Sequence, residues 1–327
     1  MARVLITGVT GQDGVYLAEL LLARGDSVVG TTRGDPLEAR TRLSAAAGGV
    51  HLRELDLRDA RAIDAVFAEV QPEHVYHLAA PAVPALAWKA PAEATDALCT
   101  VPARLLESVS RHVPTCHVVM AGSCQVFGPD SAAPQHERTP FTALTPYGAG
   151  KAYATMLAAA FRDGRSMHVS TAILFNHESA RRGSDYVTTK ICRAAVRIAS
   201  GDRTATPLSL GALDVVRDWG HAADHMRALM LMVDADEAGD YVIGTGVGRT
   251  VGEFCAAAFE RVGLDWKQHV VVDGGLARTG DVPALVADAR RARERLGWVP
   301  LITFEALLDE MLDAARGALG VSAPGQR

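Results

Sequence analysis

The stretch "RVLITGVTGQDG", residues 3–14, joins an apolar, strand-like run to a helix-like run through a glycine-rich turn. Gly8, Gly11 and Gly14 occupy the turn, and "GVYLAELLLARG" follows with helical spacing and a glycine at its end. Glycine lets the backbone turn tightly and approach a pyrophosphate, and the following helix start offers free N–H groups and a partial positive charge. The stretch therefore predicts a dinucleotide-binding strand–turn–helix unit.

Outward from this unit, apolar strand-like runs alternate with helical runs through residue 175. This alternation predicts an α/β fold with a Rossmann-type, doubly wound parallel sheet. The second half is less regular, which indicates a smaller C-terminal substrate-binding lobe. We expect the Rossmann domain to comprise residues 1–175 with about 208–246, and the lobe about 176–207 and 247–320.

Composition limits the classes of partner. The 327 residues are 49% hydrophobic and 22% charged, with a net charge of −5, so a nucleic-acid or anionic membrane surface is not expected. No apolar run reaches the roughly 20 residues that span a bilayer, and "MARVLITG" does not resemble a secretory leader. The five cysteines form no CxxC pair, so we expect reduced thiols, a cytoplasmic enzyme and no metal site.

The end of the second predicted strand, "GTTRGD", bears on the choice of cofactor. Arg33 can pair with a 2′-phosphate and favours NADP, whereas Asp35 two residues on would suit the ribose hydroxyl of NAD. We predict NADP or NAD, with NADP preferred. Asp56 is expected near the adenine, and "HLAA", residues 77–80, along the cofactor.

Tyr147 and Lys151 in "PYGAGK" are spaced i, i+4, so on a helix they share one face. A nearby ammonium favours the phenolate and should lower the tyrosine pKa. Such a tyrosine can take a proton from a sugar hydroxyl as hydride leaves for nicotinamide. Ser123, after a predicted strand, can hydrogen-bond the same oxygen. These three residues are the predicted catalytic groups.

With these motifs the chain resembles the extended short-chain dehydrogenase/reductase family of nucleotide-sugar epimerases and dehydratases, and within it the GDP-mannose 4,6-dehydratases. The resemblance runs from about Val4 to Leu312. Its most specific pieces are "LFNHESARRG" and "RDWGHA", and others are "ITGVTGQDG", "TPYGAGK", "VTTKI", "DYVIGTG" and "RLGWVP". It implies a GDP-sugar substrate and a homodimer formed through two sheet-flanking helices.

The resemblance also assigns roles to single residues. Ser123, Tyr147 and Lys151 match the catalytic residues of the family. The cofactor-binding positions that it implies are Gly8, Thr10, Gly11, Gln12, Asp13, Gly14, Arg33, Asp56, Leu57, Leu78, Ala79, Ala80, Tyr147, Lys151 and His177. The substrate-binding positions are Asn176, Lys190, Arg217, Arg278 and Asp281. Arg278 and Asp281 lie in "RTGDV", where the family usually has "RPTEVD".

Two departures from the family pattern affect the chemistry. "GSCQVFG" places Gln125 where the family has the glutamate that removes the C5 proton and helps water leave C6, and a neutral amide cannot act as that base. In "APAVPALAW", Pro81, Ala82, Val83 and Ala87 replace polar side chains beside the sugar. Oxidation at C4 remains possible, while elimination across C5–C6 is not expected.

Four functions remain open from the sequence. The preferred one is a GDP-sugar 4-epimerase that oxidises C4 and returns hydride to the other face. A 4,6-dehydratase would need another base, such as Cys124 or a water held by Gln125. A net-redox GDP-4-keto-sugar reductase and a non-catalytic nucleotide-sugar or NADP sensor are the others. The sequence does not identify the sugar.

Overall fold

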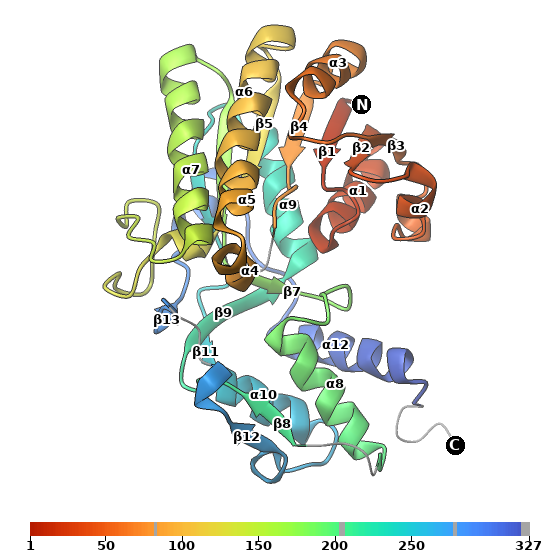
Figure 1. Ribbon diagram of the computed structural model, residues 1–327, viewed down its shortest axis with the longest axis vertical. Helices are drawn as coiled ribbons and strands as arrows, with labels where there is room; N and C mark the ends of the chain where they lie inside the picture. Colours follow the sequence, from red (N-terminus) through yellow and green to blue (C-terminus); the bar gives the residue numbers. More distant parts are fainter. Residues whose placement is uncertain (82–83, 203–206, 277–279, 322–327) are drawn as a thin grey trace.

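A parallel sheet of seven strands forms the centre of the protein, in the order β10-β6-β5-β4-β1-β2-β3. The computed structural model describes residues 1–81, 84–202, 207–276 and 280–321 (Figure 1). The strands are β1 (Arg3–Thr7), β2 (Ser27–Thr32), β3 (His51–Glu54), β4 (His74–His77), β5 (His117–Ala121), β6 (Val169–Leu174) and β10 (Asp240–Ile243). All neighbouring pairs are parallel, which confirms the predicted doubly wound fold.

Helices cover both faces of this sheet. On one face, α1 (Gln12–Arg24) and α9 (Ala222–Val233) pack side by side, with α11 (Arg290–Leu296) next to α9 and β10. On the other lie α3 (Ala60–Val70), α6 (Val101–His112) and α7 (Pro146–Arg165). Each face buries its own apolar cluster, which includes Leu17 and Leu229 on the first and Phe67 and Leu105 on the second. The two-sided burial explains why the strands read as continuous apolar runs.

Short elements connect these layers. The segment from β4 to α6 winds through three short helical turns that contact α7 or its neighbours. These are α4 (Pro84–Lys89), α5 (Pro91–Thr95) and the π-helical turn η2 (Asp96–Thr100). The remaining short elements are α2 (Pro36–Arg40), η1 (Ala45–Ala47), η3 (Cys124–Val126), η4 (Trp266–Gln268) and η5 (Gly274–Leu276).

Local sequence signals position the helix that holds the predicted catalytic pair. Thr145 is the N-cap of α7, and its hydroxyl oxygen accepts a hydrogen bond of 3.0 Å from the Gly148 N–H. Pro146 follows as the first helical residue, where its missing N–H costs nothing. Tyr147 therefore lies in the first turn of α7, with Lys151 one turn further along.

The order in which successive strands join the sheet reverses between β1 and β4. Strand β1 pairs with β2 on one side and β4 on the other, so the loops after β1 and β4 leave the sheet toward opposite faces. Open α/β sheets bind ligands in the crevice at such a point, beyond the carboxyl ends of the strands. The glycine-rich turn after β1 lies at this crevice.

The C-terminal part of the chain forms a smaller lobe below the carboxyl ends of the strands (Figure 1). Its strands are β7 (Asn176–Glu178), β8 (Leu208–Leu210), β9 (Val216–His221), β11 (Gly248–Thr250), β12 (Val270–Val272) and β13 (Ala284–Leu285). Strand β9 pairs with β7, β11 and β13, whereas β8 pairs with β12. Helices α8 (Val187–Ala199), α10 (Val251–Glu260) and α12 (Phe304–Leu319) share its apolar core. The domain limits expected from the sequence remain predictions.

No helix in residues 1–81, 84–202, 207–276 and 280–321 combines the length and apolarity that crossing a bilayer requires. The same part of the chain holds no group of three or more His, Cys, Asp or Glu side chains arranged to bind a metal ion.

Three histidine rings form a stack at the amino ends of β4, β5 and β6. His117 stacks on His168 with ring centroids 3.7 Å apart, and His74 stacks on the other side of His117 at 5.9 Å. His117 Nδ1 lies 2.7 Å from the Val233 carbonyl oxygen and His168 Nε2 lies 2.9 Å from that of Ala235, so the stack meets the end of α9. Burial lowers the pKa of His74 and of His168, and the neighbouring His117 adds to both shifts.

We predict that the free energy of unfolding decreases as the pH falls below about 6.5. The folded chain favours the neutral forms of His74 and His168, whereas the unfolded chain takes up protons at these two residues, so this stabilisation is present above pH 6.5 and is lost on acidification. Each unit of pKa shift corresponds to about 1.4 kcal/mol. Urea denaturation at pH 7.5 and 5.5 should show a smaller decrease for His74→Phe than for the parent. His51→Gln, which changes an exposed histidine, is the control. An equal decrease in all three proteins would contradict the prediction.

Candidate active site

The glycine-rich turn between β1 and α1 leaves no space for side chains. Gly8 has a φ of +75°, and a Cβ there would lie 2.9 Å from the Ala79 backbone. A Cβ on Gly14 would lie 2.5 Å from the Val9 Cα. The Gly11 N–H donates to the Gly8 carbonyl oxygen at 3.1 Å, and no side chain caps the N-terminus of α1. This cradle, with open backbone N–H groups at a helix start, fits a pyrophosphate.

The side chains beyond β2 and β3 lie where the adenosine end of a dinucleotide is expected. The Asp35 carboxylate caps α2, where it accepts from the Leu37 N–H at 2.8 Å. Asp56 instead pairs with Arg58 at 2.6 Å. Hydrogen bonds from Arg58 lower the pKa of Asp56 to about 2, with a smaller contribution from the nearby Arg33 charge. Arg33 is exposed, so two guanidinium groups lie at the expected adenosine end.

A buried polar network ties this turn to the lobe. His177 Nε2 lies 3.0 Å from an Asp13 carboxylate oxygen, and the Gln12 amide donates to the His177 carbonyl oxygen at 3.1 Å. The Ser179 hydroxyl donates to Gln12 Oε1 at 2.8 Å. Burial opposes ionisation of Asp13, but His177 holds the pKa of Asp13 well below its usual value. Burial also opposes the charge on His177, yet Asp13 raises the His177 pKa. Asp13 and His177 therefore favour each other's charged forms, and their contact joins the start of α1 to β7.

The other expected cofactor residues surround the same crevice. Ala79 approaches Gly8, and the Leu78 N–H donates to the Thr7 carbonyl oxygen at 3.2 Å. His77 is buried, and its Nδ1 lies 2.8 Å from the Thr7 hydroxyl. The remaining positions are Thr10 in the turn, Leu57 after β3 and Ala80 after β4.

Ser123, Tyr147 and Lys151 come together under the carboxyl end of β5. Ser123 follows β5 and caps η3, while Tyr147 and Lys151 lie on α7. The Lys151 ammonium donates to the Ala121 carbonyl oxygen at 2.7 Å and lies 6.0 Å from the centre of the Tyr147 ring. Each of the three side chains is more than nine-tenths buried. Burial lowers the pKa of Lys151 to about 8, against the opposing effect of Asp13.

The expected direction of the tyrosine shift was wrong in this state of the protein. Burial raises the pKa of Tyr147 well above its usual value. Ser123 and Arg182 oppose this increase, whereas the Cys124 thiol and the Tyr186 phenol add to it. The ring is enclosed by apolar side chains, and the Lys151 ammonium is directed to a backbone carbonyl, so desolvation outweighs the cation that the spacing suggested.

Gln125 lies directly beside this centre. Gly148 leaves no space for a Cβ against the Gln125 carbonyl oxygen, so the first turn of α7 packs on the Gln125 backbone. The Gln125 N–H donates to the Ser123 hydroxyl oxygen at 3.2 Å. The adjacent Cys124 is buried, and burial raises the pKa of its thiol to about 12. A thiol in that state is not a base near neutral pH.

The expected substrate residues lie in different surroundings. Arg217 is buried and forms an ion pair with Asp281, and its Nη1 donates to the carbonyl oxygens of Val216 and Val282. Asn176 begins β7, and its Oδ1 is a buried acceptor without a hydrogen-bond partner. Lys190 is exposed on α8. Arg278 lies outside the described residues.

Comparison with known proteins agrees with this arrangement. The family model described as GDP-mannose 4,6 dehydratase matches residues 5–311. The chain belongs to the GDP-mannose 4,6-dehydratase family. GDP-mannose 4,6 dehydratase 2 of Arabidopsis thaliana is 39% identical over 94% of this chain and 85% of its own. The human GDP-mannose 4,6 dehydratase is 35% identical over 95% and 90%. The UDP-glucose 4-epimerase of Thermus thermophilus, solved in complex with NAD, is 25% identical over 97% and 99%, with a TM-score of 0.83.

One buried polar cluster in this dehydratase-family chain was missed from the sequence. The Glu178 carboxylate is buried between the Arg182 guanidinium at 2.8 Å and the Thr188 hydroxyl at 2.9 Å. Arg182 also lies over the Tyr186 ring, 3.5 Å from its centre. Arg182 and Tyr186 both affect the pKa of Tyr147, so the cluster borders the catalytic centre. The spacing of four residues between Glu178, Arg182 and Tyr186 was the available signal.

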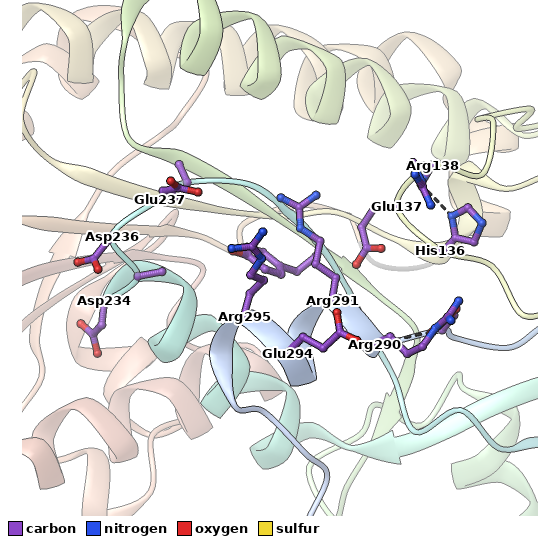
Figure 2. Close-up of a pocket in the computed structure, with 14 residues that line it drawn as sticks. His136, Glu137, Arg138, Asp234, Asp236, Glu237, Arg290, Arg291, Glu294 and Arg295 are labelled. Carbon is purple, nitrogen blue, oxygen red and sulfur yellow. Dashed lines mark hydrogen bonds and ion pairs between the residues drawn. The ribbon is translucent and has the colours of Figure 1, made fainter.

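A cavity of about 940 Å³ lies elsewhere, at the edge of the sheet beside β10 and α11 (Figure 2). Its walls are charged, and Arg291 and Arg295 project side by side from α11 in its middle. Glu137 reaches the edge strand, where it accepts from the Val242 N–H at 2.8 Å. The cavity contains none of the residues assigned to the active site of the dehydratase-family chain, so we do not assign catalysis to it.

We predict that Gly14→Ala removes dinucleotide binding and destabilises the protein by about 1–3 kcal/mol, because the new methyl group would overlap the backbone of the turn. Gly34→Ala is the matched control, since no atom lies within 4 Å of its added Cβ. Urea denaturation and calorimetric titration with NADP and NAD measure the two effects. Parent-like cofactor affinity in Gly14→Ala would contradict the assignment of the turn.

Proposed function

We propose that this chain is a GDP-sugar 4-epimerase that works through transient oxidation at C4 with a tightly bound NADP or NAD. The observation that supports this most directly is that the position whose backbone packs against the first turn of α7 and bonds to Ser123 carries an amide, Gln125. The machinery for C4 oxidation is present, whereas the carboxylate expected for elimination is replaced.

The chain's own residues divide the proton transfer among them. In the proposal, the Tyr147 phenol oxygen takes the proton from the C4 hydroxyl, and the Ser123 hydroxyl holds the same substrate oxygen. Lys151 keeps its ammonium near the ribose side and lowers the cost of the phenolate once a substrate and cofactor enclose the site. Bound nicotinamide supplies the chemistry that accepts and returns the hydride. Tyr147 then gives the proton back to the C4 oxygen, so atoms and electrons balance without an external reductant.

In this proposal, epimerisation is favoured over dehydration because no side chain near C5 of the sugar can act as a base. Removing the C5 proton requires a base, and a neutral amide at Gln125 has none. The Cys124 thiol, whose pKa burial raises to about 12, is no substitute. The 4-keto sugar therefore keeps its C6 substituent. If the 4-keto sugar rotates in the site so that hydride returns to its opposite face, the product is the C4 epimer.

For the nucleotide, we propose that Asn176, Lys190, Arg217, Arg278 and Asp281 hold the GDP portion. The buried Asn176 Oδ1 lacks a partner, which suits a ligand hydroxyl or N–H. Arg217 is already paired with Asp281, so we expect this ion pair mainly to hold the segment around Asp281 against β9.

A second candidate is a 4,6-dehydratase, which the activity named for the Arabidopsis and human relatives favours. It would require a base other than Gln125.

We further propose a cytoplasmic homodimer that packs through α6 and α7. Two large apolar side chains of α7, Tyr153 and Met156, are 41% and 57% exposed, which suits a contact with a second chain. The five cysteines are all free thiols, which suits a reducing compartment.

We expect Arg33→Ala to weaken NADP binding more than NAD binding. Asp35 is occupied in capping α2, and Arg33 and Arg58 leave positive charge where a 2′-phosphate would lie. A charge-assisted hydrogen bond to phosphate contributes about 1.5–3 kcal/mol, roughly 10- to 150-fold in affinity. Calorimetric titration measures both cofactors, with the exposed Arg42→Ala as the control. Equal losses for NADP and NAD would mean that Arg33 does not bind the phosphate.

Incubation with GDP-hexoses in deuterated water tests the proposed reaction. An epimerase leaves C5 unlabelled and the product mass unchanged, because no base touches the C5 proton. Deuterium at C5 or loss of water would establish the dehydratase alternative. Tyr147→Phe should lower turnover at C4 by about 100-fold or more while cofactor binding persists, because the ring still packs but the proton carrier is gone. A fully active Phe variant would remove the catalytic assignment.

A further inference from the structure

The charged cavity beside β10 and α11 contains two arginines that lack an anionic partner (Figure 2). Arg291 and Arg295 lie one helical turn apart on α11, and no carboxylate of the described residues forms an ion pair with either. The neighbouring Arg290 differs, because it is paired with Asp288 at 2.6 Å. Like charges at this spacing destabilise a helix, so an anion bound between the two arginines would relieve their repulsion.

Packing orients Arg291 without any contact to an acid. Its guanidinium lies over the Tyr241 ring, 5.0 Å from the ring centre. Tyr241 is only 3% exposed, so this ring is a fixed part of the core. A Cβ on Gly239 would lie 2.6 Å from Arg291 Nη2, so the guanidinium fits here because Gly239 has no side chain. Arg291 itself remains exposed to the cavity.

Carboxylates also line the cavity, but they stay apart from the arginine pair. Asp236 and Glu237 belong to the loop between α9 and β10, and both are exposed. Figure 2 shows this loop to one side of Arg291 and Arg295. Ionised carboxylates only accept hydrogen bonds, whereas guanidinium groups only donate them. The cavity therefore presents donors and acceptors at separate places on its wall.

We propose that this cavity binds a sugar phosphate, with its phosphate on Arg291 and Arg295 and its hydroxyls directed toward Asp236 and Glu237. A phosphate carries up to two negative charges and accepts from guanidinium groups in a forked geometry. The sugar hydroxyls donate to the carboxylates, so the sugar allows an anion to bind beside an acidic loop. The volume of about 940 Å³ is within the roughly 300–1,000 Å³ of small-molecule sites.

This site is separate from the catalytic centre. The residues that line it include none of those expected to bind the cofactor or the GDP-sugar, so a sugar phosphate here would not displace either. The inference consequently does not depend on the proposed C4 chemistry, and binding can be measured with NADP present.

The test is calorimetric titration of the full-length protein, in the presence of NADP, with glucose 1-phosphate. Saturable binding is expected. Arg291→Gln/Arg295→Gln should weaken it by about 10-fold or more, because charge-assisted hydrogen bonds to the phosphate are lost. Arg42→Gln/Arg61→Gln removes the same charge from two exposed arginines outside the cavity and should bind as the parent does. No saturable binding, or equal affinity in the parent and the Arg291→Gln/Arg295→Gln variant, would overturn the site.

Inorganic phosphate and AMP test the sugar side of the proposal. The parent should prefer glucose 1-phosphate to inorganic phosphate, and Asp236→Ala/Glu237→Ala should narrow that preference because the hydroxyl acceptors are gone. Equal binding of the two probes to the parent, or an unchanged preference in the alanine variant, would leave only an anion site and reject the sugar phosphate. Tighter arginine-dependent binding of AMP than of glucose 1-phosphate would reject it in favour of a nucleotide.

Discussion

The approach of Gly8 to Ala79 is the constraint on which the rest of the site depends. It brings the ends of β1 and β4 together at the point where the strand order of the sheet reverses, and it is possible only because Gly8 has no side chain and a φ of +75°. The N-terminus of α1 then opens toward the crevice, and the Asp13–His177 pair fastens that helix start to β7. The C-terminal lobe is consequently linked to the Rossmann sheet at the phosphate-binding turn.

Burial sets the chemical state of the groups near this turn. Tyr147, Lys151 and His177 are buried and Asp13 is partly buried, so the charge on each depends on its neighbours. Asp13 and His177 stabilise one another as ions, whereas Tyr147 stays protonated. The phenol can therefore become a base only when the substrate, the cofactor and Lys151 complete its surroundings, which links proton transfer to a filled site.

The sequence allowed prediction of the features that follow from local spacing. The glycine turn, the alternation of strands and helices, and the Tyr147–Lys151 face of α7 are all encoded over a few residues. The direction of the Tyr147 pKa shift was not predictable, because it depends on burial against Ala87, Ala94 and Leu98 and on the hydrogen bond from Lys151 to the Ala121 carbonyl oxygen. The Glu178–Arg182–Tyr186 cluster was missed for a related reason. Its nearness to Tyr147 follows from the tertiary fold and not from local spacing.

The Glu137 contact with β10 has a consequence for how the protein behaves in a crowded solution. Strand β10 ends the sheet, and its outward backbone groups could pair with a strand of another molecule. The Glu137 carboxylate occupies the Val242 N–H on that side and brings a negative charge to the border. A second chain that approached edge to edge would have to displace a charged acceptor. At this edge of the sheet, the Glu137 carboxylate therefore opposes strand-by-strand growth into aggregates.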